Sequence, residues 1–221
     1  MRTLRDSLRT IVALRSSDVA VEWLDAAASA SRLSALPASY TAMSRKVGRA
    51  PLALTDVEGR ELAEATPGVE FGRWTVDDLG RALLLALLAD AVDADMFRAA
   101  AVDCYEQGDA REQQSWLKSL PLLPQPERFL SYAIDACRTN ILPVFEAIAC
   151  DNPYPERFFP ELHFNQLVLK ALFVGAPLER IVGLQRRRNS ELSRMAQDYA
   201  AERRAAGRTI PSDLHMALTD D

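Results

Sequence analysis

The polar residues with the clearest chemical potential in this chain gather within residues 150–170. His163, Gln166 and Lys170 are spaced i, i+3 and i+7 in a segment, 160–174, whose pattern predicts a helix, and Asn165 lies beside them. That spacing places the three side chains on one stripe of the helix surface, called the polar stripe below. An imidazole, an amide and an amine in line could bind a polar small molecule through hydrogen bonds and charge.

Apolar residues flank the polar stripe on two sides of the predicted helix. They are Leu162, Leu169, Leu172 and Phe173 on one side, and Phe164, Val168 and Ala171 on the other. Polar groups enclosed in this way must find partners or line a cavity, because an unpaired buried polar group is costly. We therefore predict a ligand-binding pocket that this helix floors and that the preceding loop roofs. Its candidate residues are Asp151, Asn152, Tyr154, His163, Asn165, Gln166 and Lys170.

A structural role for the same residues stays open. Asn165 and Gln166 could brace the proline-rich loop through its exposed backbone, while Lys170 reaches solvent. A role for Lys170 as base or nucleophile would require a buried, neutral amine.

Motifs of the common catalytic mechanisms are missing from the sequence. The nine glycines form no phosphate-binding loop, and there is no Gly-x-Ser-x-Gly elbow. The histidines are His163 and His215, and Glu161 lies two positions from His163, so that the two would point to different sides of a helix. We predict no catalytic residue, no metal site and no cofactor.

An acidic cluster, Asp90, Asp93 and Asp95, has the composition of aspartate-rich helices that hold Mg²⁺ and diphosphate in isoprenoid enzymes. The three residues straddle a predicted helix junction, and no second acidic motif accompanies them. Capping of the next helix by Asp93 in a solvated turn is the better interpretation.

Helical periodicity with recognisable ends recurs along the chain and must position these residues. The predicted helices cover about 3–15, 18–31, 40–47, 75–89, 93–107, 109–120, 126–138, 139–149, 160–174, 177–188 and 189–207. Asp18 and Thr139 or Asn140 are predicted N-caps. Prolines 153, 155 and 160 predict a rigid loop over residues 150–160 that no helix crosses.

The composition favours an all-α fold. The 221 residues include 34 Ala and 30 Leu but only 9 Gly and 6 Ile, a bias toward helix formers and away from β-branched residues. We expect about ten helices in antiparallel hairpins, layered into a HEAT-like α–α superhelix or a compact helical bundle. A single domain over 1–221 would comprise N-terminal helices (1–54), a loose segment (55–74), a helical core (75–207) and a tail (208–221).

Charge, hydropathy and cysteine content limit the classes of partner and the location that we expect. A net charge of −5 argues against a nucleic-acid partner, and the longest apolar run, 82–89, is far short of the ~20 residues that span a bilayer. Three unclustered cysteines and an N-terminus without a signal peptide fit the cytoplasm. The Arg186-Arg187-Arg188 cluster leaves peripheral membrane association as a weaker alternative.

Several runs of the C-terminal half carry a family resemblance. The runs Cys150-Asp151-Asn152-Pro153-Tyr154-Pro155, Phe164-Asn165-Gln166 and Leu169-Lys170-Ala171-Leu172-Phe173 resemble the EboA family. So do Leu120-Pro121-Leu122-Leu123-Pro124 and Asn189-Ser190-Glu191-Leu192. The resemblance extends from about Gly108 to Pro211.

The resemblance implies a pathway context. Family members look like small all-helical proteins of bacterial natural-product gene clusters, labelled metabolite traffic. Their neighbours resemble a UbiA-type prenyltransferase, a sugar-phosphate-cyclase-like enzyme and TIM-barrel enzymes. No catalytic residue set comes with the resemblance, and it implies no fixed histidine at His163.

Two functions follow as hypotheses. The first is a non-catalytic helical protein of secondary metabolism that binds partner enzymes of its cluster and a small metabolite. The second is an enzyme that acts on a cyclitol-like or prenylated intermediate at a pocket near residues 150–170.

Overall fold

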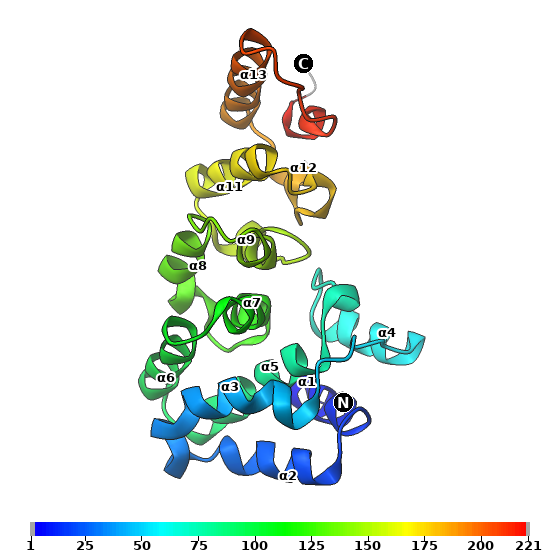
Figure 1. Cartoon of the computed structure of the whole chain (residues 1–221), viewed down its shortest axis with the longest axis vertical. Helices are drawn as coiled ribbons and strands as arrows, with labels where there is room; N and C mark the ends of the chain where they lie inside the picture. The colour runs from blue at the N-terminus through cyan, green and yellow to red at the C-terminus, as the bar shows by residue number, and fades with distance from the viewer. Residues whose placement is uncertain (1–2, 220–221) are drawn as a thin grey trace. The chain divides into compact units, whose positions relative to one another are not determined.

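The computed structural model describes residues 3–219, and these form thirteen α-helices with short 3-10 turns between them and no β-strand (Figure 1). The all-α prediction is therefore confirmed. The chain divides into two compact units, residues 1–129 and 130–221, which are described separately. The HEAT-like superhelix and the single-domain organisation with its internal boundaries stay predictions, and residues 1, 2, 220 and 221 lie outside the described part.

The first unit contains seven α-helices. They are α1 (Leu4–Ala13), α2 (Asp18–Ala27), α3 (Leu36–Val47), α4 (Asp56–Ala65), α5 (Val76–Ala91), α6 (Ala94–Glu106) and α7 (Ala110–Ser119). Helix α5 is the centre of this unit and packs against α1, α2, α3, α6 and α7. Its run of leucines is buried on nearly every side, as the almost uniformly apolar sequence of 82–89 indicates.

Helix α4 corrects the expectation of a loose segment over 55–74. Thr55 caps this helix: its hydroxyl accepts from the Glu58 amide, and its own amide donates to Glu58 Oε2 at 2.8 Å. This reciprocal capping box satisfies two amides that would otherwise lack a partner, which favours a helix despite Gly59 inside it. The 3-10 turn η2 (Phe71–Arg73) follows.

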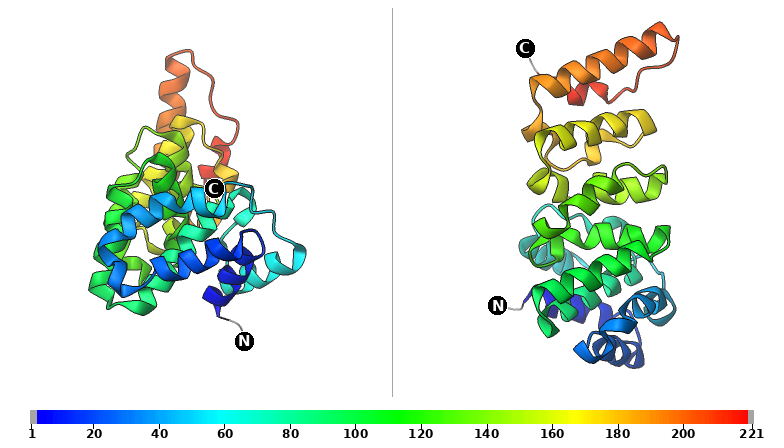
Figure 2. Two further views of the ribbon diagram at one scale, coloured as in Figure 1. Left: turned by 60° about the horizontal axis from the view of Figure 1, so that its bottom comes forward. Right: turned by 90° about the vertical axis from the view of Figure 1, so that its left-hand side faces the viewer.

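The second unit holds the predicted site. It contains α8 (Leu130–Ala136), α9 (Leu142–Ala149), α10 (Tyr154–Phe158), α11 (Glu161–Val174), α12 (Leu184–Arg187) and α13 (Ser190–Ala205). Helix α9 packs on α8, α11 packs on α9, and α13 packs on α11, so that these helices follow one another in chain order (Figures 1 and 2).

Helix α10 corrects the expectation that residues 150–160 are helix-free. Pro155 lies in its first turn, where a missing N–H removes no hydrogen bond. The helix then stops at Phe159, whose extended backbone suits the residue before a proline. The prolines therefore limit this helix to one turn but do not prevent it.

The two predicted N-caps differ by a residue or two from those in the structure. Ser17, not Asp18, is the N-cap of α2, and Ile141 precedes α9 in place of Thr139 or Asn140. The cap of α13 is Asn189, whose Oδ1 accepts from the Leu192 amide at 2.8 Å.

The C-terminal segment has local order. The 3-10 turn η6 (Leu214–Ala217) buries Leu214 and Ala217. Asp213 accepts a hydrogen bond from the Leu178 amide at 2.9 Å, which ties this segment to the turn before α12.

Candidate functional site

The polar stripe of α11 faces a groove at the C-terminal end of α8. The groove has a volume of about 320 Å³, within the lower part of the range for small-molecule sites, about 300–1,000 Å³. Its lining residues are Ile134, Cys137, Arg138, Phe159, His163, Gln166, Leu167 and Lys170. All three members of the predicted polar stripe therefore lie at one cavity, which is called the α8–α11 groove below.

Two members of the polar stripe keep their hydrogen-bonding groups available. His163 is half-buried and Gln166 is exposed, and neither side chain forms a hydrogen bond within residues 3–219. The imidazole and the amide can each donate and accept a hydrogen bond. The groove thus offers polar groups for a ligand.

Lys170 is instead engaged with the backbone at the end of α8. Its Nζ donates to the carbonyl oxygens of Cys137 and Thr139, both at 2.6 Å, and lies 5.2 Å from the centre of the Phe145 ring. A cation at this position satisfies carbonyls that the helix end leaves without partners. These two contacts fix the amine against the backbone between α8 and α9.

The residues predicted to roof the pocket do not line the groove. Asn152 is buried and closes its own loop, because its Nδ2 donates to the Ala147 carbonyl at 2.9 Å and its Oδ1 accepts from the Tyr154 amide at 3.0 Å. Tyr154 is fully buried, with its ring against those of Phe158 and Phe159.

Asp151 also has a partner within its own unit. Its Oδ2 accepts from Arg180 Nη2 at 2.7 Å and from Arg180 Nε at 3.0 Å, while its amide donates to the Arg180 carbonyl at 2.7 Å. These contacts hold Asp151 in a left-handed conformation with φ of 57°. In this structure the residue joins the loop to the turn before α12.

Asn165 forms an amide pair with Asn189. Each Nδ2 donates to the other residue's Oδ1, at 3.2 and 3.1 Å, and Asn165 is only 1% exposed. The pair ties α11 to the N-cap of α13. The structure thus places Asn165 in a bracing position, although its partner is Asn189 and not the proline-rich loop.

One flank of α11 contradicts the expectation that apolar residues are buried on both sides. Leu162 is 57% exposed and Phe173 is 71% exposed, although Leu172 of the same flank is buried, as are Phe164, Val168 and Ala171 of the other flank. The helix packs with one side on its neighbours, so the polar stripe lies at the edge of a packed face and is not enclosed between two packed faces.

Five groove residues come from outside the predicted set, and two of them, Arg138 and Cys137, carry polar groups. Arg138 is exposed and pairs with Asp135 at 2.6 Å. Cys137 is partly buried, and burial raises the pKa of its thiol to about 12, so it remains protonated near neutral pH. The sequence carries no local signal for either, since only packing brings the end of α8 to α11.

The Arg186-Arg187-Arg188 cluster is largely engaged within the chain. Arg186 Nε donates to Glu156 Oε1 at 2.7 Å, and Arg188 Nη1 donates to the Leu218 carbonyl at 2.6 Å. Arg187 lies over the Phe164 ring at 4.4 Å. These contacts disfavour the peripheral membrane alternative, which needs arginines that are free to meet phosphates.

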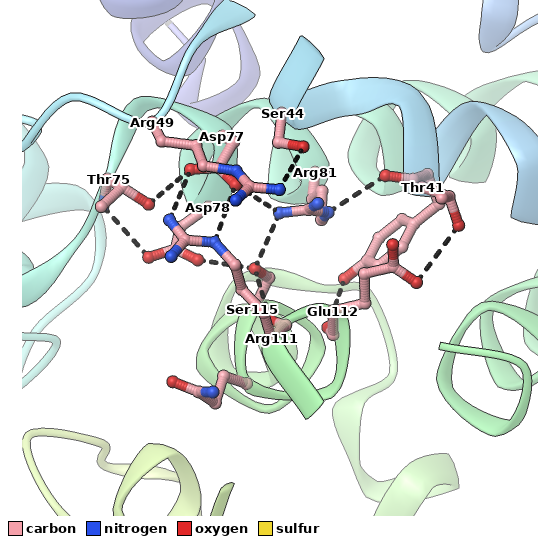
Figure 3. Close-up of polar contacts among 12 residues, drawn as sticks. Thr41, Ser44, Arg49, Thr75, Asp77, Asp78, Arg81, Arg111, Glu112 and Ser115 are labelled. Carbon is pink, nitrogen blue, oxygen red and sulfur yellow. Dashed lines mark hydrogen bonds and ion pairs between the residues drawn. The ribbon is translucent and has the colours of Figure 1, made fainter. Parts of the chain in front are cut away.

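The first unit contains a second polar cluster, centred on α5 (Figure 3). Arg81 Nη1 donates to Asp77 Oδ2 at 2.8 Å, and Arg111 of α7 approaches Asp77 Oδ1 at 3.2 Å. Asp77 is wholly buried and Arg81 is 1% exposed. The Arg81 guanidinium also lies 5.3 Å from the centre of the Tyr40 ring and donates to the Tyr40 carbonyl.

Asp78 is the second acidic member of this cluster. Its Oδ1 accepts from Ser115 Oγ at 2.6 Å, and its Oδ2 accepts from Lys118 Nζ at 2.8 Å and from the Thr75 amide at 3.0 Å. Every carboxylate oxygen of Asp77 and Asp78 therefore has a partner. The cluster joins α5 to α7 and to the loop before α5, and its contacts indicate a structural role.

A family model for "Metabolite traffic protein EboA" matches residues 4–219 of the chain. The chain belongs to the EboA family. The match extends the resemblance from the C-terminal half to nearly the whole sequence. No curated protein and no solved structure matches this EboA-family chain.

In this EboA-family protein, Asp93 of the acidic cluster Asp90, Asp93 and Asp95 caps the next helix, α6, as predicted. Asp93 Oδ1 accepts from the amides of Asp95 and Met96 at 3.0 and 2.9 Å, while Asp90 pairs with Arg5 and Asp95 with Arg128. Within residues 3–219, no three His, Cys, Asp or Glu side chains come close enough together to share a metal ion. Over the same residues, no helix combines the length and apolar character needed to cross a membrane.

Proposed function

We propose that this EboA-family chain is a non-catalytic helical protein of bacterial secondary metabolism that holds a small metabolite in the α8–α11 groove and binds partner enzymes. The observation that carries the proposal is the pairing of a small-molecule-sized groove with available polar groups of His163 and Gln166. The family's description as metabolite traffic is consistent with a protein that binds and transfers a metabolite.

Partner binding has its support on the outer side of α11. Leu162 and Phe173 belong to one stripe of this helix and are exposed. The two side chains lie about three turns apart along α11, with the half-buried Leu169 between them on the same stripe. Exposed apolar side chains along one stripe of a helix can form a contact surface for another protein. The partners we propose are enzymes of the same gene cluster: a prenyltransferase-like, a sugar-phosphate-cyclase-like or a TIM-barrel-like protein.

Affinity purification from a producing bacterium tests both parts. The tagged chain is isolated under native conditions, its bound small molecules are extracted and identified by mass spectrometry, and its bound proteins are identified in parallel. We expect a metabolite that the double variant His163→Ala, Gln166→Ala loses. We also expect a cluster enzyme that Leu162→Ser, Phe173→Ser loses.

Val57→Ser is the matched control. Val57 on α4 is 57% exposed, as Leu162 is, but lies in the other unit. The control should retain both the metabolite and the partner. Recovery of neither a metabolite nor a cluster protein with the wild-type chain would overturn the proposed function.

A further inference from the structure

The charge of the α8–α11 groove indicates what kind of molecule it holds. Two of the lining residues, Arg138 and Lys170, are cationic, and none of the eight carries a carboxylate. An acidic residue, Asp135, lies one turn before Arg138 and pairs with the guanidinium at a site where both side chains are more than 60% exposed. Such an exposed pair is weak and can give way to a ligand anion.

The rest of the lining is apolar. Ile134, Phe159 and Leu167 contribute hydrocarbon, and Phe159 and Leu167 are buried beneath the groove surface. The groove therefore combines an apolar wall with cationic and neutral hydrogen-bonding groups. A ligand that matches both needs an apolar body and an anionic group.

We propose that the groove binds a small anionic amphiphile, a molecule with one carboxylate or phosphate group and an apolar ring or chain. This inference rests on the proposed function and names its ligand class. Arg138 holds the anion, because a guanidinium binds carboxylate and phosphate oxygens through paired N–H donors. Gln166 and His163 supply further hydrogen bonds. The apolar body lies against Ile134, Phe159 and Leu167.

Lys170 can add positive charge to the groove while its amine keeps its hydrogen bonds to the backbone. An ammonium has three N–H donors, and the carbonyls of Cys137 and Thr139 use two of them. The remaining donor and the positive charge favour an anion in the groove. This arrangement also fixes the position of the charge, since the two carbonyls hold Nζ in place.

Matched naphthalene probes test the ligand class on the full chain. 2-Naphthoate, 2-naphthyl phosphate and neutral 2-naphthamide share one ring system and differ in the attached group. We measure their dissociation constants by isothermal titration calorimetry at low ionic strength. We expect one of the two anions to bind about tenfold more tightly than the amide, the strength of one charge-assisted hydrogen bond. The better anion identifies carboxylate or phosphate as the preferred group.

Charge reversal at the groove supplies the decisive comparison. Arg138→Glu should weaken the preferred anion about tenfold and leave the amide unchanged, whereas Arg194→Glu, an exposed arginine of α13 outside the groove, should alter neither. Because Arg138 is exposed, its substitution should leave the thermal unfolding midpoint nearly unchanged, which separates lost binding from lost folding.

Three results would overturn the ligand class. They are equal affinity for anion and amide, an anion affinity that Arg138→Glu leaves unchanged, and no binding of any probe. Flotation of the chain with phosphatidylglycerol vesicles, lost in Arg138→Glu, would also overturn the assignment to a small molecule, in favour of a lipid headgroup. A metabolite that co-purifies but has no anionic group would contradict the ligand class alone and would still support the proposed function.

Discussion

Asp77 and Arg81, one turn apart on α5, form an ion pair that water scarcely reaches. Their exposed fractions are 0% and 1%, and Nη1 lies 2.8 Å from Oδ2. Burial raises the pKa of the Asp77 carboxyl. Hydrogen bonds from Arg111, Thr75 and Arg81 together lower it by more than burial raises it, so that the pKa lies below its usual value. The Asp77 carboxylate stays charged in the core because both of its oxygens accept hydrogen bonds.

Removal of Arg81 should therefore destabilise the first unit strongly. Arg81→Met leaves Asp77 buried with fewer partners, and breaking a buried pair in this way costs about 3–5 kcal/mol. Urea denaturation followed by circular dichroism measures the change. Arg194→Met, which breaks an exposed pair with Glu191, should lower the unfolding free energy far less. Equal losses in the two variants would contradict this account of the α5 cluster.

Local patterning accounts for most of the fold. The leucine-rich run of α5, the cap at Asn189 and the stop at Gly175, whose φ is 77°, are each determined by a few adjacent residues. Helix α4 was not predicted because Gly59 and Pro67 favour a loose segment, although Thr55 and Glu58 form a capping box at its start. The box satisfies amides directly, whereas one glycine costs only about 1 kcal/mol.

Only the site residues that lie on one helix could be predicted to lie together. Helical spacing alone places His163, Gln166 and Lys170 on one side of α11, and the structure brings all three to one groove. The partner of Asn165 lies 24 residues away, and Arg138 reaches the groove through packing of α8, so neither relationship is encoded in local spacing.

The Asp77–Arg81 pair did leave a signal in the sequence. An acid and a base four residues apart lie on one face of a helix, and α5 is apolar on its remaining faces. When a helix is buried on all sides, such an ion pair lies inside the protein, and its two charged groups need further hydrogen-bond partners. Those partners, Arg111, which donates to Asp77, and Ser115, which accepts from Arg81, come from another helix, α7, and could not be named from spacing.

The Arg15–Glu58 pair should make stability depend on pH in the acid range. Arg15 donates to both Glu58 oxygens, at 2.8 and 2.6 Å, and this hydrogen bonding lowers the pKa of Glu58 to about 2 against burial. The ionised form is thus favoured in the folded state. Its stabilising contribution is complete above the unfolded-state pKa, about 4.5, and is lost as the pH falls toward 2.

Urea titrations of Glu58→Gln at several pH values isolate this contribution. The difference in unfolding free energy between wild type and variant should be largest at pH 6 and shrink between pH 4.5 and pH 2. Glu64→Gln, an exposed change on the same helix, is the control and should show a constant difference. A difference for Glu58→Gln that stays constant with pH would refute the role of the pair.

The adjacent residues Asn165 and Gln166 should respond in opposite ways to truncation. Asn165→Ala removes half of a buried amide pair, so that each polar atom of the Asn189 amide keeps only its contact with the Arg187 carbonyl or the Leu192 amide, at a cost of about 1–3 kcal/mol. Gln166→Ala, at an exposed position, should change stability by no more than about 0.5 kcal/mol. Conversely, only Gln166→Ala should weaken a groove ligand such as 2-naphthoate. A stability loss confined to Gln166→Ala would reverse the structural assignment of these two residues.

Lys170→Met should destabilise the second unit because the carbonyls of Cys137 and Thr139 lose their shared donor. The expected cost is about 1–3 kcal/mol, and hydrogen exchange should rise first in residues 137–141, where α8 gives way to α9. Lys46→Met is the matched control: both lysines lie 5.2 Å from the centre of an aromatic ring, but Lys46 is exposed and donates no hydrogen bond within residues 3–219. The control isolates the carbonyl contacts from the ring contact and should cost less than about 1 kcal/mol. If the two variants lose equal stability, the backbone contacts of Lys170 contribute nothing, and its amine would again be available for the chemistry of the enzyme hypothesis.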